Sequence, residues 1–252
     1  RLTEKEEESP VANLRDANIG QTSPAEKERI RDLLEQYIDI FAVNPKVVGA
    51  CEGSPMILEL NDPKCSINVA HPRSYTSEQR QMIQEEVSKL SKAGAIQPSH
   101  STWASACRTV RKKDGTVCVV QDFRGLNAFL KEQSRGLGNL STIFDEMGGS
   151  NCSACLDLAS GFLQLTIQEP DRHLTVFRDA ESKLWEYVRC GFGLKPVPSA
   201  FANYVGGQLM PVKMKGVRNW LDGIINPTAT VEDQFALLQE VFDLIRASHL
   251  SV

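Results

Sequence analysis

Two turn dipeptides restrict what this chain can fold into more than any other feature of its sequence. Asp114-Gly115 lies between the strand-like runs 107–111 and 116–120, and Asp222-Gly223 lies between the segment 217–221 and Ile224-Ile225. An Asp-Gly pair between two strand-like runs is a strong signal for a β-hairpin, because both residues tolerate the backbone angles of a tight turn. The sequence therefore predicts two antiparallel hairpins far apart in the chain.

Helical patterns surround these hairpins. Ser23-Pro24-Ala25-Glu26 is a capping box with proline at the first helical position, and apolar residues then recur at helical spacing to about residue 41. Further helices are expected from Thr76 or Ser77 to Gly94 and over 141–147, 198–210 and 231–245. Short strands are expected at 56–60, 153–158, 162–167, 175–178 and 184–188. Strands and helices without internal repeats indicate an α+β fold.

The length and composition fit a globular protein. With 252 residues and 41% hydrophobic content, the chain can bury one large core or two small ones. Residues 1–22 have few apolar side chains and no period, so we expect a disordered leader. No segment resembles a signal peptide or a membrane span, so an intracellular location without membrane association is expected, in a compartment that the sequence does not specify.

The seven cysteines are odd in number and scattered, which indicates free thiols rather than a disulfide framework. Cys152 and Cys155 form a CxxC pair. A structural zinc site needs about four ligands, and no second CxxC completes this one. The pair is interpreted as two ordinary thiols, with metal or redox use as the alternative.

Charge is unevenly distributed along the chain. The net charge of -4 disfavours binding to nucleic acid, because lysine and arginine supply most of the affinity for phosphates. Between residues 101 and 140, however, basic residues outnumber acidic ones: Arg108, Arg111, Lys112, Lys113, Arg124, Lys131 and Arg135 against Asp114, Asp122 and Glu132. This stretch fits either a nucleic-acid surface or a solvated face.

Two aspartates lie in apolar surroundings, where a carboxylate costs folding free energy and is therefore expected to have a functional role. Asp157 is inside the run Cys155-Leu156-Asp157-Leu158, and Asp222 is at the second hairpin. Hard cations such as Mg²⁺ prefer carboxylate oxygens, and two such ions can activate a hydroxyl and stabilise a leaving oxygen in nucleotidyl transfer. Alternatively, Asp222 is an ordinary turn residue, and Asp157 is a polar residue at a strand end whose carboxylate is hydrogen-bonded.

Seven segments, in order, resemble the reverse transcriptases of gypsy-type LTR retrotransposons and retroviruses, from about residue 30 to the end. They are EEVSKLSKAGAIQPSHSTWAS (85–105), VRKKDG (110–115), DFRGLN (122–127), LDLASGFLQ (156–164), DRHLTVF (171–177), FGLKPVPSAF (192–201) and WLDG (220–223). The resemblance implies a right-hand polymerase that adds deoxynucleotides to a primer on an RNA or DNA template, using two Mg²⁺ ions or Mn²⁺. It also implies a parent polyprotein with protease, thumb, RNase H and integrase.

The resemblance assigns boundaries and roles by matched position. Residues 23–75 would form an N-terminal helix and linker, 76–139 the fingers, and 140–252 an antiparallel palm sheet backed by helices, with the thumb absent. Asp157 and Asp222 match catalytic, metal-binding aspartates, and the Leu158 carbonyl matches a further metal ligand. The matched nucleotide-binding residues are Lys112, Lys113, Leu158, Phe162, Phe192 and Gly193, with Phe162 as the steric gate against a ribose hydroxyl. Asp122 and Arg124 match the template-side motif.

Departures from the family pattern bear on activity. Trp220-Leu221-Asp222-Gly223 stands where the family has aromatic-x-Asp-Asp, so a third carboxylate is missing. Val117-Cys118 replaces an expected arginine, and Lys195-Pro196-Val197 replaces a Thr-Asn-Ala-like stretch. These features predict an impaired polymerase or, as the alternative, a catalytically dead remnant that at most binds nucleic acid or a partner. A phosphate-binding module on Gly191 and Gly193 is a weaker alternative, because the rest of a phosphate-loop pattern is absent.

Overall fold

The computed structural model describes residues 17–42, 48–51, 53, 55–65, 73–111, 115, 117–132 and 140–252. The chain divides into two compact units. Unit 1 comprises Arg1–Gly49, Leu137–Ala159 and Tyr204–Val252, and unit 2 comprises Ala50–Gly136 and Ser160–Asn203. Both units are assembled from segments that are separated in the sequence. The expected disordered leader lies largely outside the described residues.

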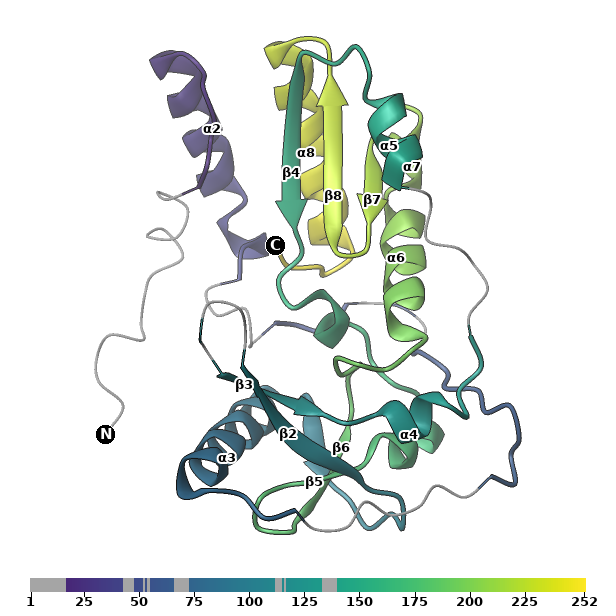
Figure 1. Ribbon diagram of the computed structural model, residues 1–252. Helices are drawn as coiled ribbons and strands as arrows, with labels where there is room; N and C mark the ends of the chain where they lie inside the picture. The colour runs from purple at the N-terminus through teal and green to yellow at the C-terminus, as the bar shows by residue number, and fades with distance from the viewer. Residues whose placement is uncertain are drawn as a thin grey trace. The chain divides into compact units, whose positions relative to one another are not determined.

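Unit 1 contains a three-stranded antiparallel sheet in the order β4-β8-β7, formed by Cys152–Asp157, Gly223–Thr228 and Arg218–Trp220. Helix α8 (Val231–Ala247) covers one face of this sheet (Figure 1). Thr230 caps α8 by accepting a hydrogen bond from the Asp233 amide. The helix buries Leu237, Leu238, Val241, Phe242 and Ile245. This apolar stripe at helical spacing packs α8 against the sheet.

The N-terminal part of unit 1 contacts α8 through side-chain hydrogen bonds and a cation–π contact. Helix α2 (Pro24–Gln36) begins at the predicted capping box and is followed by the 3-10 helix η1 (Ile38–Ile40). The Arg246 guanidinium donates to the Asp39 carboxylate at 2.7 Å and lies 4.3 Å over the Tyr37 ring. The Tyr37 hydroxyl donates to Asp243 at 2.8 Å. Unit 1 also includes α5 (Leu140–Glu146), α7 (Met210–Lys213) and the end of α6 (Val197–Gln208).

Unit 2 contains a five-stranded mixed sheet in the order β1-β6-β5-β2-β3. Its strands are Ile96–Pro98, Leu184–Tyr187, Phe177–Arg178, Ser105–Arg111 and Val117–Gln121, respectively. β2 and β3 form the predicted first hairpin, and only the β2–β5 pair is parallel. Helix α3 (Ser77–Lys92) has a capping box formed by Thr76 and Gln79 and packs against this sheet. Unit 2 also includes α4 (Arg124–Asn127), η2 (Gly161–Gln164) and η3 (Glu169–Thr175).

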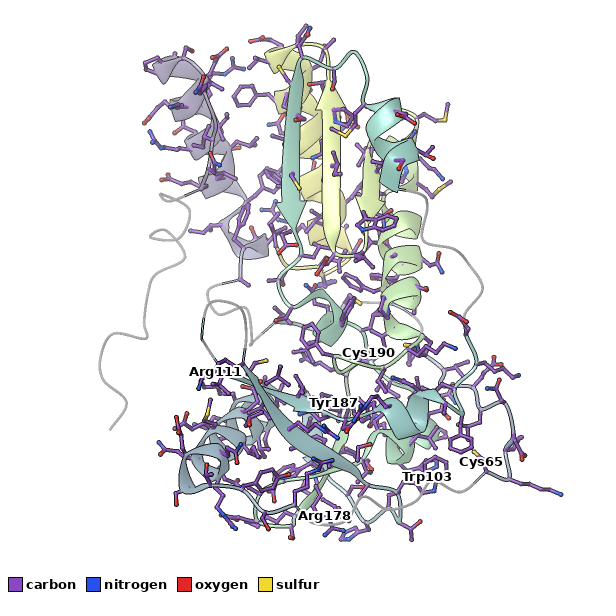
Figure 2. The ribbon with its side chains drawn as sticks, viewed as in Figure 1. Cys65, Trp103, Arg111, Arg178, Tyr187 and Cys190 are labelled. Atoms are coloured by element: carbon purple, nitrogen blue, oxygen red, sulfur yellow. The ribbon has the colours of Figure 1, made fainter. Side chains whose placement is uncertain are left out.

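A buried tyrosine organises the core of unit 2. The Tyr187 ring (Figure 2) packs against Phe177 and Phe123, and its hydroxyl donates to the Gln121 side chain at 3.0 Å. Burial raises the pKa of the Tyr187 hydroxyl, so it stays a neutral donor. A Cβ atom at Gly191 would lie 2.7 Å from this ring, so only glycine fits there. Gly191 is therefore a packing residue.

Several predicted strands have a different structure. Residues 56–60 form only isolated bridges, Met56 with Ile167 and Leu60 with Leu130. The segment 162–167 begins as the 3-10 helix η2, because Ser160 takes a left-handed φ of 42° that turns the chain sharply. Likewise, η3 occupies 169–175, so only β5 remains of the strand predicted at 175–178. Among the described residues, no helix is long and apolar enough to cross a membrane.

Candidate functional site

The β7–β8 hairpin has a two-residue turn formed by Leu221 and Asp222. Trp220 pairs with Gly223, so the predicted turn at Asp222-Gly223 is wrong by one residue. Leu221 takes the positive φ, 54°, and Gly223, outside the left-handed region, begins β8. A leucine in the left-handed region costs free energy, and such residues cluster at functional turns. The turn thus resembles a constrained functional loop more than a generic Asp-Gly turn.

Asp157 and Asp222 lie close together at one end of the unit 1 sheet. Asp157 ends β4 and pairs with Gly223 across the β4–β8 ladder. The Leu158 amide donates to the Asp222 main-chain carbonyl at 2.9 Å, which fixes the turn beside the end of β4. Partial burial and the negative charge of Asp222 raise the pKa of the Asp157 carboxyl. A cation bound here would relieve this repulsion.

The oxygen atoms at this end of the sheet fit a hard cation. Asp157 and Asp222 offer carboxylates, and the Leu158 carbonyl accepts no hydrogen bond from any described residue. Mg²⁺ prefers such oxygen ligands and keeps several waters or substrate oxygens. The described residues contain no group of three or more His, Cys, Asp or Glu side chains that could hold a metal ion. The carboxylates of Asp157 and Asp222 and the Leu158 carbonyl therefore suit one divalent cation better than two.

Gly223 stands opposite Asp157, where a side chain would project on the same face of the sheet. A Cβ atom at Gly223 would have its nearest neighbour, the Trp220 carbonyl oxygen, at 3.4 Å, which is an ordinary contact. The backbone at Gly223 is also outside the left-handed region. Neither space nor φ therefore requires glycine at this position.

The matched aromatic residues lie together in unit 2. The Phe162 ring is half-buried and lies 5.4 Å from the exposed Phe192 ring and 5.8 Å from the buried Phe201 ring. Gly193 takes a φ of +89°, which favours glycine, and its carbonyl accepts a hydrogen bond from Asn127. Phe162, predicted as a gate, is thus held between two rings. The role of Phe201 in this cluster was missed by the sequence analysis.

Asp122 and Arg124 form a pair, which had been left open from sequence. Arg124 donates two hydrogen bonds to the Asp122 carboxylate, at 2.7 and 2.8 Å, and these hydrogen bonds lower the pKa of Asp122 to about 2. The Arg108 Nε atom lies 2.7 Å from the same carboxylate as an ion pair without hydrogen-bond alignment. Two guanidinium groups thus face one carboxylate, leaving a net positive charge. Arg108 was not singled out from sequence, although it lies in the basic stretch.

Other sequence candidates have simpler explanations or lie outside the described residues. Lys112 and Lys113 belong to the part of the first hairpin that the structure does not describe. Cys152 and Cys155 both lie on β4, three residues apart, so their side chains point to opposite faces of the sheet and cannot share one ion. The phosphate-loop alternative weakens too, because packing and a positive φ account for Gly191 and Gly193.

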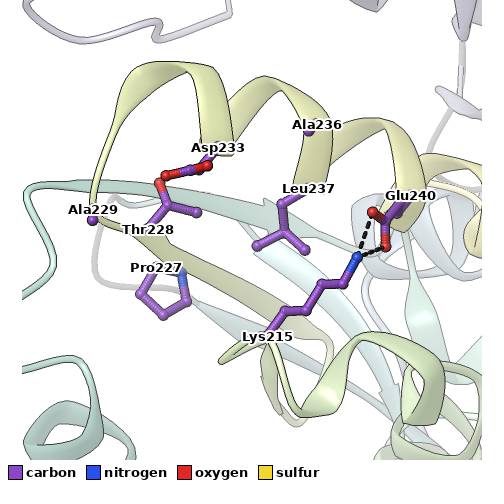
Figure 3. Close-up of a pocket in the computed structure, with 8 residues that line it drawn as sticks. All are labelled: Lys215, Pro227, Thr228, Ala229, Asp233, Ala236, Leu237 and Glu240. Carbon is purple, nitrogen blue, oxygen red and sulfur yellow. Dashed lines mark hydrogen bonds and ion pairs between the residues drawn. The ribbon is translucent and has the colours of Figure 1, made fainter.

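A separate pocket of about 410 Å³ lies at the far end of β8 (Figure 3). It is lined by Lys215, Pro227, Thr228, Ala229, Asp233, Ala236, Leu237 and Glu240. Lys215 donates to both Glu240 oxygens at 2.6 Å, so the charges at one side of the pocket are already paired. Since Thr228 is five residues from Gly223 along the strand, roughly 17 Å separates this pocket from the aspartates.

The fold matches that of solved polymerases from foamy virus. A structure of the foamy viral protease-reverse transcriptase in complex with double-stranded DNA aligns with a TM-score of 0.85 and 21% identity, over 97% of this chain and 43% of that chain. A second structure, in complex with an RNA/DNA hybrid, aligns with a TM-score of 0.85 and 20% identity, over 96% of this chain and 33% of that chain. The chain therefore has the mixed α+β fold of a retroviral Pol enzyme.

Sequence relatives agree with this fold. The retrovirus-related Pol polyprotein from transposon 412 of Drosophila melanogaster is 28% identical over 239 residues, covering 90% of this chain and 18% of that protein. The enzymatic polyprotein of soybean chlorotic mottle virus is 27% identical over 197 residues, covering 72% of this chain and 28% of that protein. No protein-family model matches the chain. The chain is homologous to a segment of retrotransposon and retroviral Pol polyproteins, and the narrower gypsy-type assignment stays a prediction.

Proposed function

We propose that this chain is the fingers and palm part of a reverse transcriptase from a retroelement, with an impaired metal site. The observation that carries the proposal is the placement of Asp157 and Asp222 at one end of the unit 1 sheet, with Gly223 opposite Asp157. Homology to Pol polyproteins supplies the class of enzyme. In this proposal the palm comprises residues 140–252, whose strands carrying Asp157 and Asp222 belong to unit 1, and residues 76–136 of the predicted fingers belong to unit 2. The thumb and the other polyprotein activities belong to a longer parent protein.

The proposed reaction is template-directed addition of a deoxynucleotide to a primer 3′-hydroxyl. Two bound divalent cations would supply activation of that hydroxyl and stabilisation of the leaving pyrophosphate oxygens. Asp157, Asp222 and the Leu158 carbonyl would hold Mg²⁺ or Mn²⁺ through their oxygens. Without a carboxylate at 223, the same two dications face less negative charge. Since this chemistry depends on electrostatic stabilisation of the transferring phosphoryl group, weaker ion binding raises the barrier.

Residues of unit 2 would bind the nucleotide and the template. The Phe162 ring, held by Phe192 and Phe201, is stiff enough to exclude a ribose 2′-hydroxyl by size. Lys112 and Lys113 would meet the triphosphate as point charges. The surplus positive charge of Arg108 and Arg124 around Asp122 would meet template phosphates, because the Arg124 side chain is 75% exposed.

Primer extension tests the proposal. The chain as it stands, Asp157→Asn and Gly223→Asp are compared on a primed RNA template with Mg²⁺ and with Mn²⁺. We expect little or no extension by the unchanged chain and partial recovery in Gly223→Asp when a thumb is supplied in the same polypeptide. Robust synthesis by the unchanged chain that Asp157→Asn abolishes would show that the site is not impaired.

The second candidate is a catalytically dead remnant that binds nucleic acid. Gly223 favours it, since the missing carboxylate weakens only the chemistry and leaves the basic residues of unit 2 in place. The two candidates separate in one experiment: a remnant binds duplex with a salt-dependent affinity but gives no extension even as Gly223→Asp with a thumb supplied. An impaired enzyme recovers measurable extension in that variant.

A further inference from the structure

The peptide group between Leu158 and Ala159 is held at its amide end. The Ala159 amide donates to the Ser251 main-chain carbonyl at 3.0 Å, and the preceding Leu158 amide donates to the Asp222 carbonyl at 2.9 Å. In a trans peptide the carbonyl points away from the amide of the same plane. The Ser251 carbonyl therefore turns the Leu158 carbonyl to the opposite side, where no described residue donates to it.

Ser251 is itself fixed by the N-terminal segment of unit 1. The Val252 amide donates to the Ile40 carbonyl at 2.8 Å, and the Ala42 amide donates to the Val252 carbonyl at 2.9 Å. In this pairing Val252 bonds to the residues on either side of Phe41, which is the pattern of a parallel ladder. Because Asp39 is in turn paired with Arg246 of α8, residues 39–42 are anchored rather than loose. A path of hydrogen bonds and short main-chain segments thus runs from α8 to the peptide between Leu158 and Ala159.

We propose that Ser251 is a positioning residue for the metal site: its main-chain carbonyl holds the Leu158 carbonyl in the orientation that binds the cation. The proposal rests on the proposed function, because it assumes that a cation binds at Asp157 and Asp222. The sequence gives no signal for this role of Ser251, because the group that orients Leu158 is the Ser251 main-chain carbonyl. Its place is defined by the pairing of residues 251 and 252 with two distant segments.

Groups that orient metal ligands, without touching the metal, commonly change metal affinity when they are lost. A free peptide plane can rotate, so the carbonyl spends less time facing the ion, and binding weakens without any change in the carboxylates. Removing Ser251 and Val252 should therefore weaken Mn²⁺ binding by roughly tenfold, the lower end of the usual range for such losses.

The test measures two quantities on the full chain, in the original sequence and in the Gly223→Asp background. Mn²⁺ affinity is measured by titration with detection of free Mn²⁺ by electron paramagnetic resonance, with Asp157→Asn to identify the specific site. Amide hydrogen exchange reports the Ala159 amide directly, without metal. In the chain lacking residues 251 and 252, we expect faster exchange at Ala159 together with the loss of affinity. If residues 251 and 252 only stabilised the fold, their removal would lower the melting temperature without both faster exchange at Ala159 and weaker Mn²⁺ binding.

The outcomes separate the two claims. If Asp157-dependent Mn²⁺ binding exists but is unchanged by the truncation, the positioning role is wrong and the metal site stands. If no Asp157-dependent binding occurs in either background, the metal site of the proposed function is wrong, and the positioning role falls with it. Should the truncated chain fail to fold, Val252→Pro removes the amide that bonds to Ile40 and favours extended backbone at Ser251, while the Ser251 carbonyl remains. It should weaken Mn²⁺ binding about threefold, and an unchanged affinity in a folded Val252→Pro chain would overturn the proposal.

Discussion

Gly223→Asp should act in opposite directions on stability with and without a divalent cation. Residue 223 pairs directly with Asp157, so the new carboxylate would stand about 5 Å from it at the Cβ atoms. Two charges at this distance repel by about 1 kcal/mol with water-like screening and about 3 kcal/mol at an effective dielectric constant of about 20. Since Asp157, although partly desolvated, keeps much of its exposure to solvent, the lower figure applies. We expect the metal-free variant to melt about 2–4 °C below the original chain.

A bound cation should reverse this loss. If the added carboxylate strengthens Mn²⁺ binding tenfold, saturating Mn²⁺ stabilises the variant by about 1.4 kcal/mol more than the original chain. The two melting temperatures should therefore converge or cross as Mn²⁺ is added. Thermal unfolding followed by circular dichroism, in EDTA and over a series of Mn²⁺ concentrations, measures both effects.

Gly223→Asn is the matched control, because asparagine has nearly the same shape and backbone preferences as aspartate without its charge. It should show neither the metal-free repulsion nor the gain with Mn²⁺. Identical curves for Gly223→Asp and Gly223→Asn at every Mn²⁺ concentration would refute the reasoning, since the charge at 223 would then not act on Asp157. Because Gly223 lies outside the left-handed region, backbone strain should not obscure the comparison.

Three further outcomes are expected. Gly191→Ala should destabilise the fold by about 1–3 kcal/mol in urea unfolding, because a Cβ atom at this position would lie 2.7 Å from the Tyr187 ring. Gly207→Ala should be neutral or stabilising, because a Cβ atom there has no neighbour within 4 Å. Equal effects of the two substitutions would contradict the packing argument. The pKa of Asp122 is lowered to about 2 in the folded chain, against about 3.9 in the unfolded chain, so the stabilisation by its ionised carboxylate is present above about pH 4 and is lost as pH falls towards 2. The free energy of unfolding of Asp122→Asn should therefore depend less on pH in this window. Parallel curves of unfolding free energy against pH for the two chains would count against this prediction. Lys112→Glu with Lys113→Glu should weaken duplex binding and reduce its salt dependence, while Lys89→Glu on α3 should not; an unchanged salt slope in a filter-binding assay would make these lysines a solvated face.

Local signals predicted the parts of the fold that local interactions determine. The capping box at Ser23 placed the start of α2 correctly, because it is made within one helical turn. The start of α3, expected at Thr76 or Ser77, was also correct. A strand was expected at 162–167; Leu163, Leu165 and Ile167 are buried there, but the segment begins as a 3-10 helix. A left-handed Ser160 redirects the chain into a 3-10 helix there, and no periodicity in the apolar residues reveals that turn.

Long-range contacts explain what the sequence could not predict. The second hairpin was expected at Asp222-Gly223, yet its turn is at Leu221 and Asp222. The hydrogen bond from the Leu158 amide to the Asp222 carbonyl depends on a residue far from the hairpin, so the exact register is not encoded in the hairpin alone. Likewise, Arg108 joins Asp122 across the β2–β3 ladder, which only the strand register brings together.

The pairing of the N-terminal segment with the end of α8 has a consequence for synthesis of the chain. Asp39 and Arg246 are 207 residues apart in sequence, so unit 1 cannot close until residue 246 has left the ribosome. At roughly 5–20 residues per second, α2 waits about 10–40 s for its partner helix. All segments of unit 2 are complete earlier, by Asn203. Unit 2 can therefore fold first, and the strand that carries Asp157 stays unpaired, and prone to aggregation, until β8 is made.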